Sequence, residues 1–383
     1  MTERSGGRTE GRRSLVWTAP GTASYLRDLP RALADRLEIA EIPADPLADP
    51  RLSEVRVLIP PLVRNQADAD YDLRAVLTQA KSLEYVQALT AGVDSLRPDV
   101  PDQVTLCTVR GAYDDLMAEL LLAGILACYK EIPHYAAAQA RGAWEPKPVR
   151  VLSGARVLFV GYGSIARTLE RYLEPFKVEV KRIARRPRSV LPNVGQFGAE
   201  HNGADTAAGR AGGTGANAGS GGAGTQGTGP NATGPNGNGP NGHGPNETEV
   251  AGLAELSTLL PSADIVVVLT PLTDQTLGLV DDNFLSLMQP GALLVNGARG
   301  LIVDTEALLA ATDRGKVRAY LDVTDPEPLA PNHPLWSAPG VFITPHIGSL
   351  VPDNRDRAFA VVRANLGRWV RGEPLENVVE GDY

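Results

Sequence analysis

Cysteine is scarce in this 383-residue sequence, which contains only two, Cys107 and Cys128, both within apolar runs. This scarcity excludes a secreted scaffold held by disulfides and a zinc site with cysteine ligands. Long hydrophobic runs are also lacking, because the best candidate for a membrane span covers only residues 116–128 and contains Glu119. No signal-peptide pattern follows the polar start of the chain, so we expect a disordered tail over residues 1–13 and a cytoplasmic location.

Positive charge is in deficit as well, since 37 Lys and Arg face 45 Asp and Glu, giving a net charge of −8. Without a basic stripe, we expect no nucleic-acid partner. We likewise expect no membrane partner and no metal site. The length predicts two or three domains, each large enough to bury a core.

Large apolar side chains are almost absent from residues 196–248. This stretch is rich in Gly, Pro and Asn, and Gly-Pro-Asn recurs every five residues from Gly229 to Gly244. Such a composition buries too little apolar area to offset the entropy of ordering. We therefore expect a disordered insertion, and its simplest interpretation is a tolerated loop without a function.

Short apolar runs alternate with amphipathic stretches in the rest of the chain. We expect strands over residues 15–18, 37–42, 55–59, 85–89, 104–108, 156–160, 178–183, 264–269, 292–296, 317–321 and 341–344. Helices are expected over residues 24–36, 71–81, 117–129, 164–173, 253–260, 282–288, 305–312 and 353–371. This alternation predicts an α/β protein with two doubly wound parallel-sheet domains.

A glycine-rich turn follows the expected strand 156–160. In the pattern Gly161-x-Gly163-x-x-Ala166, the first glycine permits a tight turn and the second lets the backbone approach a pyrophosphate. The helix that follows directs its N-terminus at the phosphates. Because both the preceding strand and the following helix are expected, we interpret the pattern as a dinucleotide site rather than a ligand-free turn.

The next strand ends in Ala184-Arg185-Arg186, where NAD sites usually carry an acidic residue for the ribose 2′-hydroxyl. Guanidinium groups without that carboxylate suit a 2′-phosphate, which favours NADP(H) over NAD. The alternative is a solvated turn in an arginine-rich protein.

Two further groups follow expected strand ends, where ligands of α/β sheets bind. Arg299 can bind a carboxylate through two parallel hydrogen bonds, although a surface role is as common for an arginine. Glu327 and His346 follow successive strands, and a carboxylate beside an imidazole fixes its tautomer and suits it to acid–base work. Of the five histidines, His346 alone sits at a strand end.

These motifs, in this order, resemble the D-isomer-specific 2-hydroxyacid dehydrogenases. The resemblance runs from about Glu54 to the end of the chain, apart from the insertion. It is carried by the turn at Gly161 and by the motifs Gln87-x-x-x-Ala-Gly92-Val93-Asp94, Met117-Ala-Glu119, Leu152-Ser-Gly154-Ala-x-Val157, Asn296-Gly-Ala-Arg299-Gly, Asp322-Val-x-x-Pro-Glu327-Pro, His333-Pro-Leu-Trp and Thr344-Pro-His346.

The resemblance implies a Rossmann cofactor domain, residues 116–347, inserted in a flavodoxin-like substrate domain made of residues 14–115 and 348–383. It also implies a homodimer formed through the cofactor domain. The substrate would be a 2-oxo or D-2-hydroxy acid bound in the cleft between the domains. Glyoxylate and hydroxypyruvate are plausible 2-oxo acids by family analogy.

The resemblance also implies roles for individual residues. Arg299 and the backbone at Gly92 and Val93 would bind the substrate carboxylate, while His346, paired with Glu327, would act as general acid. The cofactor would contact the residues of the glycine turn, the arginines that follow the next strand, and later strand ends: Gly161, Gly163, Ser164, Ile165, Arg185, Arg186, Thr270, Pro271, Gly297, Ala298, Asp322 and Gly348.

Two alternatives stay open. One is an NAD-linked D-2-hydroxyacid or phosphoglycerate dehydrogenase, against which the arginine turn speaks. The other is a dinucleotide-sensing corepressor on the same fold, with the insertion as a tether. Glu327 stands where formate dehydrogenases differ, which argues against that branch. Arg110 is a candidate for a second acidic group on the substrate, and a surface role for it is equally plausible.

Overall fold

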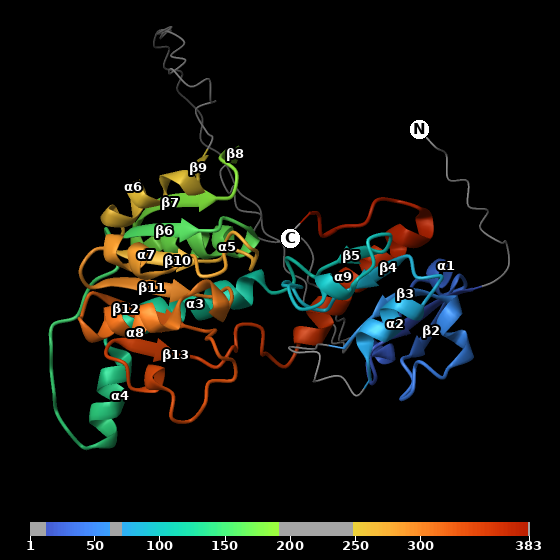
Figure 1. Cartoon of the computed structure of the whole chain (residues 1–383), viewed down its shortest axis with the longest axis horizontal. Helices are drawn as coiled ribbons and strands as arrows, with labels where there is room; N and C mark the ends of the chain where they lie inside the picture. Colours follow the sequence, from blue (N-terminus) through green and yellow to red (C-terminus); the bar gives the residue numbers. More distant parts are fainter. Residues whose placement is uncertain (1–12, 62–70, 191–247, 382–383) are drawn as a thin grey trace, which may run out of the picture. The chain divides into compact units, whose positions relative to one another are not determined.

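A computed structural model describes residues 13–61, 71–190 and 248–381 (Figure 1). Most of the expected N-terminal tail and insertion lies outside the described residues. Two parallel sheets organise the described chain, as the alternation of strands and helices predicts. No helix among the described residues is long and apolar enough to cross a bilayer.

The first sheet contains five strands in the order β2-β1-β3-β4-β5, and every pair of neighbours is parallel. This is the order of flavodoxin-like folds. The strands are β1 (Ser14–Thr18), β2 (Leu37–Glu41), β3 (Val55–Ile59), β4 (Tyr85–Gln87) and β5 (Thr105–Cys107).

Helices cover both faces of this sheet. Helix α2 (Leu73–Gln79) begins where the Asp72 carboxylate accepts a hydrogen bond from the Ala75 amide, and its Leu77 packs with Leu58 of β3. On the other face, the C-terminal helix α9 (Asn354–Arg371) packs Phe359 against the first sheet. The end of the chain therefore returns to the sheet that its beginning forms.

The expected helix over residues 24–36 is wrong as a single element. The segment forms a 3-10 helix, Ala23–Leu26, and a one-turn helix α1 (Arg31–Ala34), separated at Pro30. Proline disfavours helical backbone at the preceding residue and cannot donate a helical hydrogen bond, so one continuous helix cannot form here.

The second sheet contains eight strands in the order β13-β12-β11-β10-β6-β7-β9-β8. The expected strands are found as β6 (Arg156–Val160), β7 (Glu179–Ala184), β10 (Ile265–Val268), β11 (Ala292–Asn296), β12 (Val317–Leu321) and β13 (Val341–Ile343). Two further strands, β9 (Thr248–Gly252) and, at the edge of the sheet, β8 (Arg188–Val190), were not expected. Neighbouring strands pair in parallel from β13 through to β9.

The helices of this region are α3 (Asp114–Tyr129), α5 (Ser164–Leu173), α6 (Leu256–Leu259), α7 (Asp282–Leu287) and α8 (Thr305–Asp313). A further helix, α4 (Ile132–Ala140), was missed. Glu131 separates it from α3 by adopting left-handed backbone (φ 55°). His134 lies within α4.

Candidate active site

The turn between β6 and α5 has the geometry of a phosphate-binding loop. Gly161 has φ 97°, and an added Cβ would lie 2.6 Å from the Leu269 carbonyl carbon, so only glycine fits. Gly163 is the N-cap residue of α5 and provides no side-chain hydrogen bond, and nothing lies within 4 Å of where its Cβ would be. The first amides of α5 therefore have room for an anion at the positive end of the helix.

Thr270 follows β10 beside this turn. An added Cβ on Gly161 would lie 2.6 Å from the Thr270 amide nitrogen, which places the two residues in contact. The Thr270 hydroxyl is buried and has no hydrogen-bond partner within the described part of the chain. Since buried polar groups are rarely left unpaired, this hydroxyl fits a ligand that supplies the missing partner.

The end of β7 carries the two arginines considered for the cofactor. Ala184 is buried, whereas Arg185 and Arg186 are exposed and make no hydrogen bond or ion pair to other described residues. A neighbouring arginine, Arg188, donates a hydrogen bond of 2.7 Å to the Tyr162 carbonyl within the glycine turn. The arginine segment and the glycine turn are thus adjacent.

The turn after β11 is shaped by a buried amide. Asn296 donates from Nδ2 to the Arg299 carbonyl at 2.8 Å and accepts from the Ala298 amide at 3.1 Å. Gly297 is tightly packed, because an added Cβ would meet Leu121 of α3 at 2.7 Å. The backbone that carries Arg299 is therefore held from both sides.

The Arg299 side chain reaches the segment that contains Gly92. Its Nε donates to Asp94 Oδ1 at 2.9 Å, and its Nη1 donates to the Ala298 carbonyl at 2.8 Å. An added Cβ on Gly92 would lie 1.6 Å from Nη2, so the guanidinium occupies the space that a side chain would need. The structure thus brings together two residues predicted to bind the substrate carboxylate, and Val93 follows directly.

Glu327 and His346 form a direct pair. The distance between His346 Nδ1 and Glu327 Oε1 is 2.6 Å, and both side chains are about one-third exposed. A carboxylate at this distance holds a proton on Nδ1 and fixes the orientation of the ring. The two residues follow β12 and β13, which are neighbours in the sheet, as the sequence predicts.

The loop after β13 is anchored by Asp322, which is 1% exposed. Its carboxylate accepts hydrogen bonds from Thr344 Oγ1 at 2.6 Å, from the Ile347 amide at 3.0 Å and from the Gly348 amide at 3.2 Å. These contacts make Asp322 a positioning residue for the loop that carries His346. The cofactor contact that the resemblance implies for Asp322 stays a prediction.

The remaining predicted residues lie at the same strand ends. Ser164 and Ile165 form the first turn of α5, and Pro271 follows Thr270 and accepts a hydrogen bond from Thr276. Gly348 is buried, and an added Cβ would lie 1.8 Å from the sulfur of Met117 in α3.

Comparison with known proteins decides the family. The model for the NAD-binding domain of D-isomer specific 2-hydroxyacid dehydrogenases matches residues 122–211 and 229–348, more than half of the chain. The chain belongs to the D-isomer specific 2-hydroxyacid dehydrogenase family. It is therefore an NAD(P)-dependent oxidoreductase, and the motifs quoted from its sequence identified the family correctly.

Individual relatives agree with this assignment. Glyoxylate/hydroxypyruvate reductase A of Klebsiella pneumoniae is 26% identical over 79% of this chain and 82% of its own length. A glyoxylate reductase of Thermofilum pendens is 42% identical, but over only 31% of this chain and 35% of its own. A solved structure of a family protein from Aeromonas salmonicida covers 97% of this chain and 99% of its own, with a TM-score of 0.66 and 25% identity.

The cofactor of this family fits the residues present. The uncapped start of α5 and the unpartnered Thr270 hydroxyl suit the pyrophosphate and its neighbourhood, and Gly163 leaves the approach open. A reduced nicotinamide would supply a hydride there.

Several site residues escaped the reasoning from sequence. Asp94 lies within a quoted motif, but nothing in the pattern showed that it pairs with Arg299. Asp114 accepts a hydrogen bond of 3.1 Å from the Ser164 hydroxyl at the start of α5, and burial raises the pKa of this carboxyl group. Thr344 acts through a hydrogen bond to Asp322, 22 residues away, which leaves no local signal in the sequence. Asn296 bonds within its own turn, and the quoted motif that contains it did not reveal this role.

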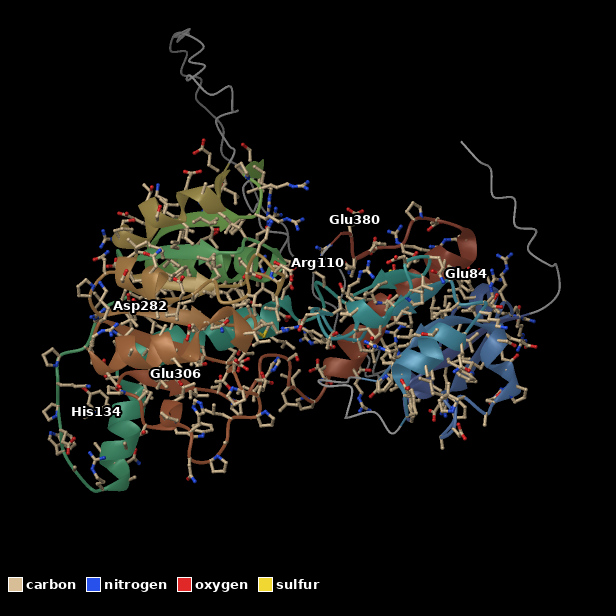
Figure 2. All side chains as sticks on the ribbon, viewed as in Figure 1. Glu84, Arg110, His134, Asp282, Glu306 and Glu380 are labelled. Carbon is tan, nitrogen blue, oxygen red and sulfur yellow. The ribbon has the colours of Figure 1, made fainter. Side chains whose placement is uncertain are left out.

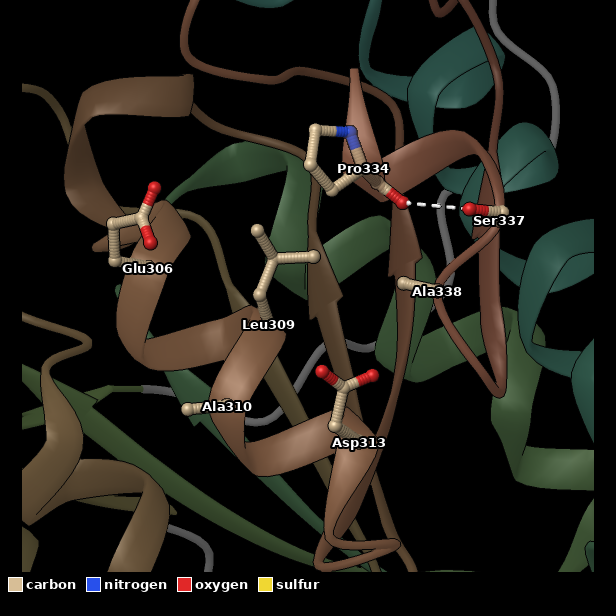
Figure 3. A pocket seen from close by; sticks show the side chains of 7 residues that line it. All are labelled: Glu306, Leu309, Ala310, Asp313, Pro334, Ser337 and Ala338. Carbon is tan, nitrogen blue, oxygen red and sulfur yellow. Dashed lines mark hydrogen bonds between the residues drawn. The ribbon is translucent and has the colours of Figure 1, made fainter. Parts of the chain in front are cut away.

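Two other features lie apart from this set. Arg110 is exposed, and its Nε contacts Asn377 Oδ1 at 3.4 Å (Figure 2). A hollow of about 470 Å³ lies between α8 and the 3-10 helix Pro334–Trp336 (Figure 3). None of the predicted site residues lines it; the lining residues are Glu306, Leu309, Ala310, Asp313, Pro334, Ser337 and Ala338.

Proposed function

We propose that the protein reduces a 2-oxo acid to the D-2-hydroxy acid, with Arg299 binding the carboxylate and His346 supplying the proton. The contact of 2.6 Å between His346 Nδ1 and Glu327 carries this proposal. Reduction of a ketone needs a proton donor at the carbonyl oxygen, and an imidazole oriented by a carboxylate is suited to that task.

In this scheme each residue has a separate task. The Arg299 guanidinium, steadied by Asp94, binds the carboxylate together with the backbone at Gly92 and Val93. Glu327 keeps the proton on Nδ1, so we assign Nε2 of His346 as the nitrogen that donates to the ketone oxygen. The nicotinamide, when bound, would supply the hydride that C2 takes up, so that hydride and proton together account for the two-electron reduction.

For the cofactor we propose a preference for NADPH. Arg185 and Arg186 are exposed and unpaired within the described residues, and Ala184 offers no carboxylate to a ribose 2′-hydroxyl. Two guanidinium groups beside the glycine turn suit a 2′-phosphate.

The family and one relative aligned over about four-fifths of both chains support a proposal for the substrate class. Because the Klebsiella pneumoniae relative is named for glyoxylate and hydroxypyruvate, we propose small 2-oxo acids of this type as substrates. We also propose residues 14–115 with 348–383 as the substrate domain and residues 116–347 as the cofactor domain. The proposed insertion, residues 196–248, lies almost wholly outside the described chain.

We further propose that the protein is a homodimer and that the segment after α4 contributes to the interface. Trp144 is 95% exposed and Val151 is 67% exposed, although hydrogen bonds fix this segment. Tyr135 donates to the Lys147 carbonyl at 3.0 Å, and Lys130 donates to the Arg150 carbonyl at 2.9 Å. A fixed segment with exposed apolar side chains is typical of an interface.

The reaction is tested by following NADPH oxidation with glyoxylate, hydroxypyruvate, pyruvate and phenylpyruvate, and repeating each assay with NADH. We expect turnover that favours NADPH. Turnover with NADH alone would overturn the cofactor preference and support the NAD-linked alternative. Cofactor binding without any turnover would favour the sensing alternative.

Two variants separate the roles. His346→Gln should lower kcat by about 10²–10⁴-fold because it removes the proton donor, while His134→Gln in α4 serves as the matched control.

Replacing both Arg185 and Arg186 by Ala should raise KM for NADPH and leave KM for NADH unchanged. Replacing the exposed Arg27 and Arg31 by Ala should change neither constant.

A further inference from the structure

His346 adopts a backbone conformation that needs support. Its φ is 53°, in the left-handed region that residues with a Cβ rarely occupy. Its amide donates to the Asp322 carbonyl at 2.7 Å, and the next two amides donate to the Asp322 carboxylate. The strained position of His346 therefore depends on where Asp322 is held.

A chain of hydroxyl groups continues from Asp322 into the core. Thr344 Oγ1 lies 2.6 Å from Asp322 Oδ1, and the Tyr320 hydroxyl lies 3.0 Å from the same Thr344 oxygen. A threonine hydroxyl has one proton, and an ionised carboxylate can only accept. Thr344 must therefore donate to Asp322, so the Tyr320 hydroxyl must donate to Thr344.

The Tyr320 ring is fixed by its surroundings. Tyr320 is fully buried in β12 and stacks on Phe342 of β13 with a centroid distance of 5.4 Å. An added Cβ on Gly124 of α3 would lie 2.0 Å from the Tyr320 ring, so this glycine makes room for the tyrosine. Burial raises the pKa of the Tyr320 hydroxyl, which therefore keeps its proton.

We propose that Tyr320 is a positioning residue for the reaction, and that its hydroxyl acts through Thr344 and Asp322 to hold the loop that carries His346. This inference rests on the proposed function, because it assigns a task to a residue that touches neither substrate nor cofactor. The Tyr320 hydroxyl is bonded to Thr344, and Thr344 in turn is bonded to Asp322.

The first test compares Tyr320→Phe with the wild type in the reduction of hydroxypyruvate by NADPH. We expect kcat to fall about 3- to 10-fold, as for the loss of one hydrogen bond, with KM for hydroxypyruvate within twofold of the wild type. Tyr85→Phe is the matched control, because the Tyr85 hydroxyl is buried without a partner among the described residues. Equal kcat for Tyr320→Phe and the wild type would overturn the proposal.

A double-mutant cycle tests the order of the links. Thr344→Val keeps the shape of the side chain and removes the hydroxyl, so it should lower kcat more than Tyr320→Phe does. Adding Tyr320→Phe to Thr344→Val should then have little further effect, because Tyr320 acts only through Thr344. Thr344→Ser should restore most of the activity. If the fall in kcat of the double variant equalled the product of the two single falls, Tyr320 would not act through Thr344.

The same cycle is measured in urea unfolding of the full chain, which requires no turnover. Each single variant should lower the urea concentration at the unfolding midpoint. The double variant should lower it by less than the sum of the two single shifts. If the wild type reduced no 2-oxo acid, the proposed function would fall, and the unfolding cycle would still decide whether the hydrogen-bonded chain exists.

Discussion

At the scale of single residues, the contact between Gly92 and Arg299 gives the most direct prediction. Gly92→Ala would place a methyl group 1.6 Å from Nη2 of Arg299, and the guanidinium must move. Loss of charged hydrogen bonds to the substrate costs about 1.5–3 kcal/mol, so KM for the 2-oxo acid should rise about 10- to 100-fold. Steady-state kinetics at saturating NADPH measures this change.

Gly252→Ala is the control for that substitution. Its added Cβ would meet only Pro187, at an ordinary 3.5 Å, and we expect unchanged kinetics. A Gly92→Ala enzyme with wild-type KM would show that the Arg299 guanidinium is not held beside Gly92 during catalysis.

Candidate catalytic and binding residues that follow a strand end can be predicted from the sequence. The residues that hold them in place through hydrogen bonds cannot. Arg299, Glu327 and His346 could be singled out because each follows a recognisable strand in a motif of the family. Asp94 and Tyr320 could not be singled out in this way. Asp94 pairs with Arg299 and Tyr320 with Thr344, and these contacts are visible only in three dimensions.

At the scale of elements, apolar runs located the buried strands well. Parallel strands covered on both faces are apolar throughout, and runs such as 265–268 and 292–296 are entirely buried. Short edge strands such as β8 carry polar residues, and they escaped prediction for that reason. The helix expected over residues 24–36 was wrong because it ran through Pro30, which divides the segment.

Helix α9 is tied to the first sheet by a buried amide pair. Asn365 is fully buried; its Nδ2 donates to Gln87 Oε1 at 2.8 Å and to the Glu376 carbonyl at 3.0 Å, and its Oδ1 accepts from the Glu376 amide. Asn365→Ala leaves these groups unpaired and should lower the free energy of unfolding by roughly 1–3 kcal/mol.

Urea unfolding checks this loss, with the exposed Asn332→Ala as the control. An Asn365→Ala protein as stable as the wild type would mean that the amide pair does not anchor α9 to the sheet.

At the scale of the whole molecule, the alternation of strands and helices predicted two parallel sheets, and the structure has them. The domain boundaries stay a prediction, because the sequence marks them only through the family resemblance. The homodimer is likewise a prediction, based on the family resemblance and on exposed apolar residues of a single chain.

The homodimer is tested through Trp144. Trp144→Glu replaces an exposed apolar side chain by a charge, which is costly to bury in an interface. We expect the variant to sediment as a monomer at concentrations where the wild type sediments as a dimer. Trp336→Glu changes a second tryptophan, which is half-exposed, and should leave the assembly intact. A wild type that is monomeric at every concentration would contradict the proposed homodimer.

We propose that this chain directs a hydride to C2 of a 2-oxo acid while His346 protonates the oxygen. The most direct measurement uses NADPH deuterated at both C4 positions with hydroxypyruvate, followed by mass spectrometry and chiral analysis of the product. We predict D-glycerate with one deuterium at C2, and none of it with His346→Gln on the same timescale. Oxidation of the cofactor without deuterium at C2 of the product, or a product of the opposite configuration, would contradict the proposed reaction.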